Sequence, residues 1–320
     1  MITESQHDAF QSRGLLRLER FLPADEVIRT RDVVIRALGR HGCVQRDGVW
    51  DFTGLEQLPQ FSDAAGHHKV RSTLKQGVGL SHKLIPAELL DAVQTLAGGA
   101  VVPMNPSRRL KPALLLSVPN AKAWAVPPNG WHVDLPKLRN RGTPPGVQLF
   151  ALLDTVRPGG GGTVVVTGSH RLLDGVPFLG PSMKHAKRLR RLPFFADLMS
   201  EEPPNRARLM SESHREGDVD LQVVELHGGP GDVFLVDMRV LHAEAPNASR
   251  APRMMFTQRF TREDVLDEMM LASGPNSGYA AEAVLPAAQG ARGDTAQARS
   301  AYKQEVNGGS AWESNPAPPR

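Results

Sequence analysis

The chain has 320 residues, of which 40% are hydrophobic, and a formal net charge of +4. This length suits one large domain or two small ones, and so weak a positive charge does not indicate a nucleic-acid partner. Cys43 is the only cysteine, which excludes an internal disulfide and fits the reducing cytoplasm. The polar N-terminus lacks a signal-peptide pattern, and no apolar run approaches the roughly 18 residues of a membrane span. We therefore expect a cytoplasmic protein without a membrane partner.

The first forty residues predict a helix, a strand and a second helix. Residues 22–40 carry apolar side chains at helical spacing, with Pro23 near the start of the run and Gly39 near its end. Another amphipathic helix is predicted over residues 85–96. Because these helices precede a long series of strands, we expect them to cover a β core.

From residue 111 onwards the pattern changes to short β-type segments bounded by Gly, Pro and Asp. The predicted strands are 111–118, 146–154, 162–168, 221–226, 232–237 and 253–260. Short strands at such spacing favour an antiparallel sandwich or barrel. The predicted fold class is therefore mainly β with flanking helices.

Two segments depart from this strand pattern. Residues 172–220 are polar, charged and partly helical, and they are too long for a passive loop, so they predict a lid or wall over a site. Residues 286–320 are poor in large apolar side chains and are expected to be disordered. We expect a single domain over residues 1–285, with 172–220 as a lid-like insertion and 286–320 as a tail.

One short motif, G-W-H-V-D-L at residues 130–135, carries two groups that can bind a metal. On an extended strand, His132 and Asp134 point to the same face. His242 closes a later strand and turn, and Arg253 opens the next apolar strand. Two imidazoles and one carboxylate form the facial triad of non-haem Fe(II) oxygenases, and an arginine fork suits the far carboxylate of a 2-oxo acid.

These blocks occur in the order H-x-D, G-G-T-V-V-V-T-G-S-H-R and G-D-x-x-x-x-D-x-x-x-x-H, followed by the arginine. Together with the lead-in G-L-L-R-L-E-R-F-L-P-A-D-E-V, this order resembles the phytanoyl-CoA dioxygenase family over about residues 8–262. The resemblance implies a double-stranded β-helix, a jelly-roll barrel of the cupin type. It also implies an Fe(II)- and 2-oxoglutarate-dependent dioxygenase that uses O₂ and releases succinate and CO₂.

The same resemblance implies roles for individual residues. His132, Asp134 and His242 would be the iron ligands, and Arg253 would bind the distal carboxylate of 2-oxoglutarate. Halogenating relatives replace the ligand carboxylate with a small residue, so the presence of Asp134 implies hydroxylation of an unactivated C–H bond or a related oxidation. The implied substrate is a small molecule, such as an amino acid or a natural-product intermediate.

Further pocket residues follow from strand parity and from the resemblance. Gln148 and Phe150 have the same parity, should face the barrel interior and are expected beside the co-substrate, while Leu114 is a weaker pocket candidate. Glu244, two residues after the second histidine, stands where the phytanoyl enzyme has a serine. This departure argues against a phytanoyl substrate.

Several alternatives remain open at this point. The chain could be a non-catalytic β-barrel relative that binds a metal or a small molecule. His170 is expected to be a structural turn residue, whereas His67 and His68 are either exposed loop residues or part of the site mouth. The basic run 184–191 is either a solvated helix face or a contact for an anionic substrate.

Overall fold

The computed structural model describes residues 2–40, 42–52, 79–104, 108–119, 123–134, 142–174, 176, 188–201 and 206–273. Its helices are α1 (Glu4–Arg13), α2 (Ala24–Arg40), α5 (Ala87–Ala97), α7 (Pro193–Leu198), α8 (Arg208–Ser211) and α9 (Glu263–Ser273), with 3-10 helices η1 (His82–Leu84) and η2 (Arg171–Leu173). Its strands are β1 (Leu15–Leu18), β2 (Val44–Arg46), β3 (Val49–Asp51), β4 (Val101–Pro103), β5 (Ala113–Ser117), β6 (Gly146–Leu152), β7 (Thr163–Thr167), β8 (His214–Glu216), β9 (Val219–Glu225), β10 (Val233–Asp237), β11 (His242–Glu244) and β12 (Arg253–Arg262). In these ranges no helix is both long and apolar enough to cross a membrane.

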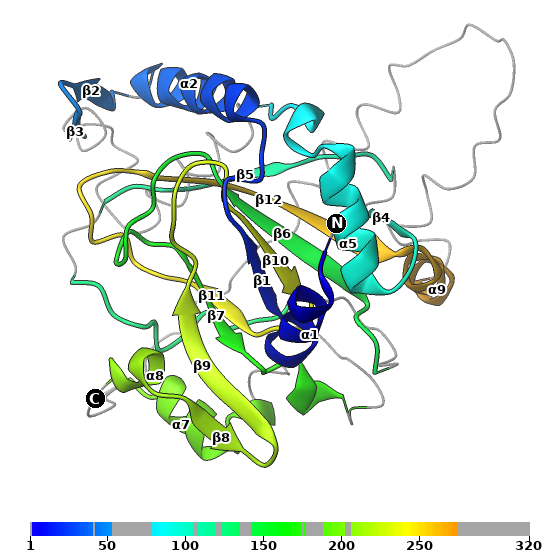
Figure 1. Cartoon of the computed structure of the whole chain (residues 1–320). Helices are drawn as coiled ribbons and strands as arrows, with labels where there is room; N and C mark the ends of the chain where they lie inside the picture. The colour runs from blue at the N-terminus through cyan, green and yellow to red at the C-terminus, as the bar shows by residue number, and fades with distance from the viewer. Residues whose placement is uncertain are drawn as a thin grey trace, which may run out of the picture.

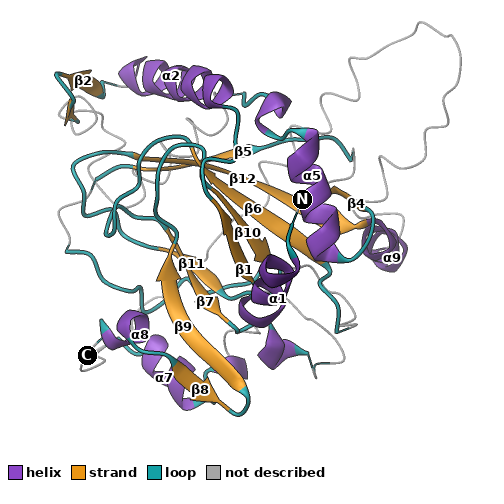
Figure 2. Cartoon of the chain, in the orientation of Figure 1, coloured by secondary structure: helices purple, strands orange, loops and turns teal. Residues whose placement is uncertain are grey.

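The strands form two antiparallel sheets and a separate hairpin (Figures 1 and 2). The large sheet has the order β1-β10-β6-β12-β4, and β5 also pairs with β12. The small sheet has the order β11-β7-β9-β8, and β2 pairs with β3. All six predicted strands and the three predicted N-terminal elements are therefore confirmed, whereas β2, β3, β4, β8 and β11 were not predicted.

The large sheet is buried on both faces because its strands alternate between two apolar clusters. On β6, Leu149 and Ala151 pack in the cluster that includes α2 and α5. Phe150 and Leu152 point the other way, into a cluster shared with Val165 of the small sheet. The helices thus cover one face of the large sheet, and its inner face packs against the small sheet (Figure 1).

The outer face of the small sheet is covered by α7 and α8 (Figure 2). Phe195 and Leu209 of these helices join Val164 and Val166 of β7 in a third apolar cluster. The described part of the segment 172–220 therefore contributes β8 to the small sheet and α7 and α8 to a layer outside it.

The two sheets do not close into a barrel among the described residues. Their inner faces pack against each other. Isolated backbone bridges join His132 with His242, Val156 with Gly228 and Gly160 with Asn247, and of these residues only His242 lies in a strand. Single bridges replace the continuous hydrogen-bonded ladders that a closed barrel requires. The prediction of a mainly β fold with antiparallel sheets is confirmed, and closure is not seen.

A buried ion pair fixes the turn between β10 and β11. Asp237 is 1% exposed and accepts hydrogen bonds from the Arg239 side chain at 2.8 and 3.1 Å. Burial alone would raise the pKa of Asp237, but the Arg239 charge outweighs burial and lowers it. Arg239 also donates to Asp174 at 2.6 Å. Removing one partner would leave an uncompensated buried charge, so this turn is held rigidly.

His170 ties the same region to the N-terminal helix. Its Nε2 is 2.9 Å from the carbonyl oxygen of Gln11, and the ring lies against Gly14, whose φ of 68° and lack of a Cβ allow the close approach. Burial lowers the pKa of His170. As predicted, His170 is a structural residue.

We predict that lowering the pH from about 7 to about 5 destabilises the wild-type protein more than the His170→Gln variant. Unfolded His170 binds a proton below its ordinary pKa of 6.5, whereas the buried ring resists it. The stabilisation is therefore complete above that pH and is lost as the pH falls towards the lowered pKa of the folded chain. The free energy of unfolding should depend on pH more steeply in the wild type than in the variant, and the difference between the two slopes should approach about 1.4 kcal/mol per pH unit. Urea unfolding over a pH series measures it, and parallel curves would contradict the prediction.

Candidate metal centre

The backbones of His132 and His242 pair directly, although these residues are far apart in the chain. Each N–H donates to the other residue's carbonyl oxygen at 2.9 Å. This reciprocal bridge places the segment that carries His132 beside the start of β11. Trp131 and Val133 point away from the site and are buried in the outer cluster of the small sheet. The predicted alternation of the G-W-H-V-D-L motif is therefore confirmed.

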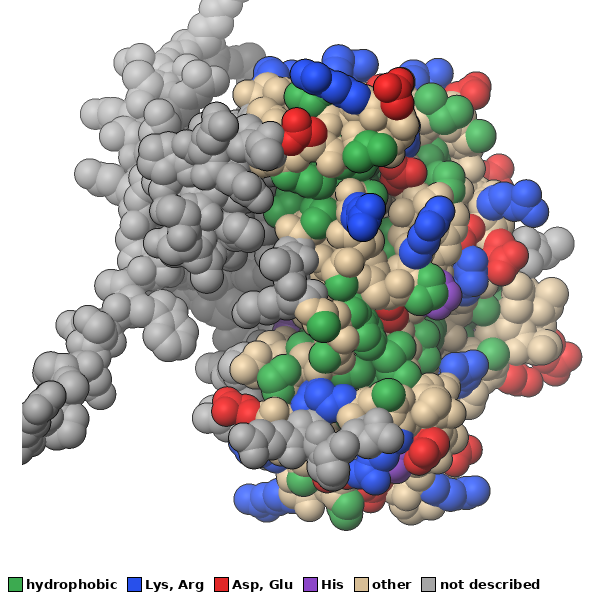
Figure 3. Space-filling view, turned by 90° about the vertical axis from the view of Figure 1, so that its left-hand side faces the viewer, with side chains coloured by type: hydrophobic (Ala, Val, Ile, Leu, Met, Phe, Trp, Pro, Cys, Tyr) green, Lys and Arg blue, Asp and Glu red, His purple; other side chains and the backbone are tan. Residues whose placement is uncertain are grey.

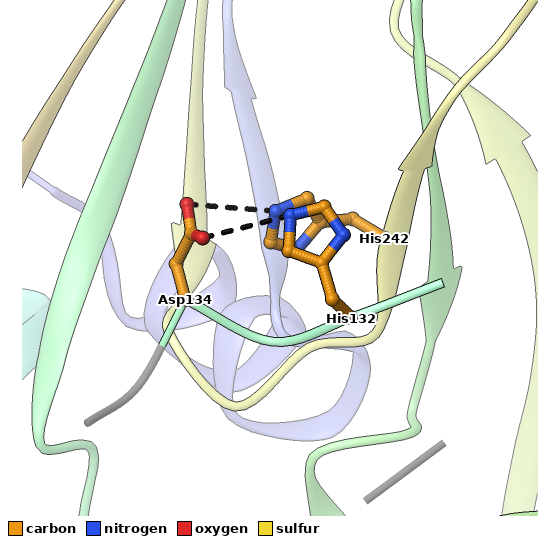
Figure 4. Close-up of side chains that lie close together, drawn as sticks. All are labelled: His132, Asp134 and His242. Atoms are coloured by element: carbon orange, nitrogen blue, oxygen red, sulfur yellow. Dashed lines mark ion pairs between the residues drawn. The ribbon is translucent and has the colours of Figure 1, made fainter. Parts of the chain in front are cut away.

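The side chains of His132, Asp134 and His242 converge on one point (Figure 4). One possible ligand atom from each residue lies within 4.8 Å of the other two. The Nε2 of His132 is 3.6 Å from Asp134 Oδ1, and the Nε2 of His242 is 3.7 Å from Asp134 Oδ2. At these separations the three groups could bind a single cation.

Backbone carbonyls set the orientation of both imidazoles. The Nδ1 of His132 is 2.8 Å from the carbonyl oxygen of Gly130, and the Nδ1 of His242 is 3.1 Å from that of Val240. A carbonyl oxygen only accepts, so Nδ1 carries the hydrogen in both rings. The Nε2 lone pairs then face Asp134, as metal-binding histidines require.

The electrostatics of the cluster favour cation binding. Burial, followed by the proximity of His242, lowers the pKa of His132, so its imidazole is neutral at neutral pH. Burial alone would raise the pKa of Asp134, but the neighbouring His242 and Arg259 outweigh burial and hold it below its ordinary value. A His132 imidazole with a lowered pKa and an Asp134 carboxylate with a lowered pKa both favour the deprotonated forms that bind metals.

Gln148 and Phe150 of β6 surround the cluster from the inner face of the large sheet. Gln148 Nε2 donates to Asp134 Oδ2 at 2.8 Å and lies 3.4 Å from Thr257 Oγ1. The Phe150 ring meets His242 edge-on, with centroids 6.0 Å apart. Both residues are buried and face inwards as predicted, and Gln148 directly orients the carboxylate of Asp134.

Arg253 lies on the same inner face, at the start of β12, with its side chain 2% exposed. Its Nη1 donates to the carbonyl oxygen of Gly161 at 2.6 Å, and its Nη2 donates to Glu244 at 3.3 Å. Glu244 follows His242 by two residues on β11 and so shares its side of the strand. Arg253 is therefore linked through Glu244 to the strand that carries His242.

A cavity of about 440 Å³ adjoins Arg253 on the side of the β2–β3 hairpin. Arg31, Arg157 and Arg250 also line it, and Asp154 pairs with Arg31 at 2.8 Å. The lining is thus net positive. Figure 3 shows Lys and Arg side chains along the upper edge of one face of the molecule, beside hydrophobic ones.

One predicted pocket residue lies on the wrong face. Leu114 is buried in the helix-covered cluster, opposite Phe256, whereas its neighbour Leu115 contributes to the inner cluster. The expectation was wrong by one position of strand register, because adjacent residues point to opposite faces. His67, His68 and residues 184–187 of the basic run lie outside the described residues.

Arg259 is the residue at this site to which sequence reasoning assigned no role. Its Nη1 lies 3.8 Å from Asp134 Oδ2. The available signal was strand parity, because Arg259 shares the face of Arg253 and Thr257 on β12.

Three comparisons place the chain among known proteins. In sequence, no curated protein matches it. Similar solved structures include the epimerase SnoN in complex with Fe3+, alpha ketoglutarate and nogalamycin RO (17% identity, 81% of this chain and 83% of that chain, TM-score 0.45). Another is AviO1 from Streptomyces viridochromogenes Tue57, with 19% identity over 83% of this chain and 97% of that chain and a TM-score of 0.43. A third is EctD from S. alaskensis with 2-oxoglutarate and 5-hydroxyectoine, with 18% identity over 82% of this chain and 77% of that chain and a TM-score of 0.45. The model of the phytanoyl-CoA dioxygenase (PhyH) family matches residues 10–255, and the chain therefore belongs to this family.

Proposed function

We propose that the protein is an Fe(II)- and 2-oxoglutarate-dependent dioxygenase that hydroxylates an unactivated C–H bond of a small molecule and releases succinate and CO₂. The observation that carries this proposal is the convergence of His132, Asp134 and His242 in a chain of the PhyH family. The substrate belongs among small molecules such as amino acids or natural-product intermediates.

The chemistry of the three donors fits iron. A structural zinc site is usually closed by four protein ligands, whereas two imidazoles and one carboxylate are the ligand set of non-haem Fe(II) oxygenases. When bound there, iron and 2-oxoglutarate would together supply the activation of O₂. His132, Asp134 and His242 would hold the metal, with both imidazoles already in the tautomer that ligation needs.

The surrounding residues would position the ligands and exclude water. Gln148 holds the carboxylate of Asp134, which restricts its rotation. The inner faces of the two sheets contribute aliphatic and aromatic side chains, including Phe150 and Met255, and these keep the space beside the cluster apolar. Because the carboxylate of Asp134 takes the position that a halogenase leaves for chloride, hydroxylation is the reaction we propose.

Arg253 would bind the distal carboxylate of 2-oxoglutarate. Its planar fork suits a carboxylate, and its burial would strengthen the pairing. The positive lining of the adjoining cavity would also attract a dianion. Glu244 already contacts Nη2, so the co-substrate would share the guanidinium with an internal carboxylate.

The fold proposal follows from the same arrangement. The large and small sheets would be the two halves of a double-stranded β-helix, with the cluster between them. Residues 1–285 would then form one domain.

Incubation with Fe(II), 2-oxoglutarate and ascorbate should yield succinate, and a suitable substrate should increase the yield. The variants His132→Ala and Asp134→Ala should each lose Fe(II) binding, measured by calorimetry without oxygen, because each removes one of three ligands. His82→Ala, an exposed histidine, is the matched control. Unchanged iron affinity in the ligand variants would refute the assignment. Iron binding without succinate under any condition would point to a non-catalytic relative.

Gln148→Met should weaken metal binding by about 10- to 100-fold, because Asp134 loses the hydrogen bond that orients it. Binding of Mn(II) or Co(II) can be measured by calorimetry. Gln222→Met is a matched control, since Gln222 on β9 donates to the carbonyl oxygen of Met210 instead. Equal metal affinities for the two variants would contradict the role given to Gln148.

Glu244→Gln should tighten the binding of 2-oxoglutarate several-fold, since a like charge would no longer lie beside its distal carboxylate on Arg253. Arg253→Leu should weaken the binding of 2-oxoglutarate by more than about 30-fold, because its distal carboxylate would lose the guanidinium with which it pairs. Calorimetry on the Co(II)-loaded protein measures both. Weaker binding in Glu244→Gln would show that Glu244 instead positions Arg253 for the co-substrate.

A further inference from the structure

Two arginines, Arg253 and Arg259, share the inner face of β12. Arg253 pairs in register with Ser117 at the start of the strand, and Arg259 pairs with Gln148 near its end. Gln148 is the residue that holds Asp134. Arg259 therefore lies at the level of the cluster, and Arg253 lies several residues further along the inner face.

The side chains of the two arginines and of the cluster differ widely in their exposed fractions. The Arg253 side chain is 2% exposed and that of His242 is 6% exposed. Asp134 is 23% exposed and His132 is 37% exposed, while Arg259 reaches 45%. Among these five side chains Arg259 is therefore the most accessible and Arg253 the least. A co-substrate anchored at Arg253 would leave the guanidinium of Arg259 for the substrate.

A hydrogen bond from Arg259 is not what orients the carboxylate of Asp134. Its Nη1 lies 3.8 Å from Asp134 Oδ2, beyond hydrogen-bond distance, and Gln148 already donates to that oxygen at 2.8 Å. In the part of the chain that the structure describes, Asp134 is the only ionic contact of Arg259. A half-exposed cation beside three metal-binding groups has its other N–H donors available to a ligand.

We propose that Arg259 binds a carboxylate of the substrate and so selects carboxylate-bearing small molecules, an inference that rests on the proposed function. A single guanidinium matches a single carboxylate in charge and in bidentate geometry. A phosphate dianion would keep an uncompensated charge beside the carboxylate of Asp134. Held at Arg259, the substrate would present the carbons near its carboxylate to the metal cluster.

The test uses the full-length protein loaded with Co(II) and 2-oxoglutarate. The probes are small organic carboxylates, each paired with its primary amide, and a set of phosphate monoesters. Ligand-observed NMR measures their binding to wild type, Arg259→Gln, Arg259→Lys and Arg262→Gln. Arg262 lies on the opposite face of β12 and pairs with Asp264, so its variant controls for the loss of a positive charge.

Carboxylates should bind wild type and Arg262→Gln with similar affinity. They should bind Arg259→Gln at least tenfold more weakly, and Arg259→Lys with an intermediate affinity. The amides should not distinguish the proteins. Carboxylates that bind Arg259→Gln and wild type equally, or that bind neither, would overturn the inference, as would a preference for phosphates.

Two further measurements separate this inference from the function on which it rests. The Co(II) and 2-oxoglutarate affinities of Arg259→Gln should fall far less than its carboxylate affinity, and an equal or larger loss of either would assign Arg259 to the metal or the co-substrate instead. If wild type itself binds neither Co(II) nor 2-oxoglutarate, the proposed function fails. If it binds both but no carboxylate, only the role of Arg259 fails.

Discussion

The reciprocal backbone hydrogen bonds between His132 and His242 are the contact on which the site depends. Each bond satisfies a polar group that burial would otherwise leave without a partner. The bridge is isolated, so no longer ladder joins the two segments, although β11 itself pairs with β7. A single pair of hydrogen bonds therefore brings together side chains from distant parts of the chain, and it does so with the backbone. The side chains remain available for chemistry.

The rigidity behind this bridge comes from buried polar contacts beneath it. The turn that leads to His242 rests on the pair of Asp237 and Arg239, and Ser169 Oγ accepts a hydrogen bond from the backbone N–H of Leu241 at 2.9 Å. Burying two charges is costly, and replacement by apolar residues is often neutral for stability. These hydrogen bonds are directional, and they connect the turn before His242 to Asp237 and Ser169.

Depth and charge divide the site into two regions. At the first end the guanidinium of Arg253 is buried beside the 42% exposed Glu244, and burial of the guanidinium strengthens its electrostatic contacts. The open end contains Arg259 and His132, where water weakens each contact and permits exchange. A dissociable substrate suits the open end, and a co-substrate that must be held in one orientation suits the buried end. The alternation of β12 supplies both arginines from one strand face.

The sequence by itself determined the longer strands, the N-terminal helices and the alternation at His132 and Asp134, because local periodicity and turn residues encode them. The order of the motifs also identified His242 and Arg253 as candidate site residues. The strand register of Leu114, the short strands β4 and β11 and the contact of Arg259 with Asp134 depended on tertiary structure. Strands of three residues carry too little pattern to be recognised, and a one-residue shift reverses every side chain. Which groups meet across the two sheets was decided only by the pairing of distant backbone segments, an interaction that no local run of residues records.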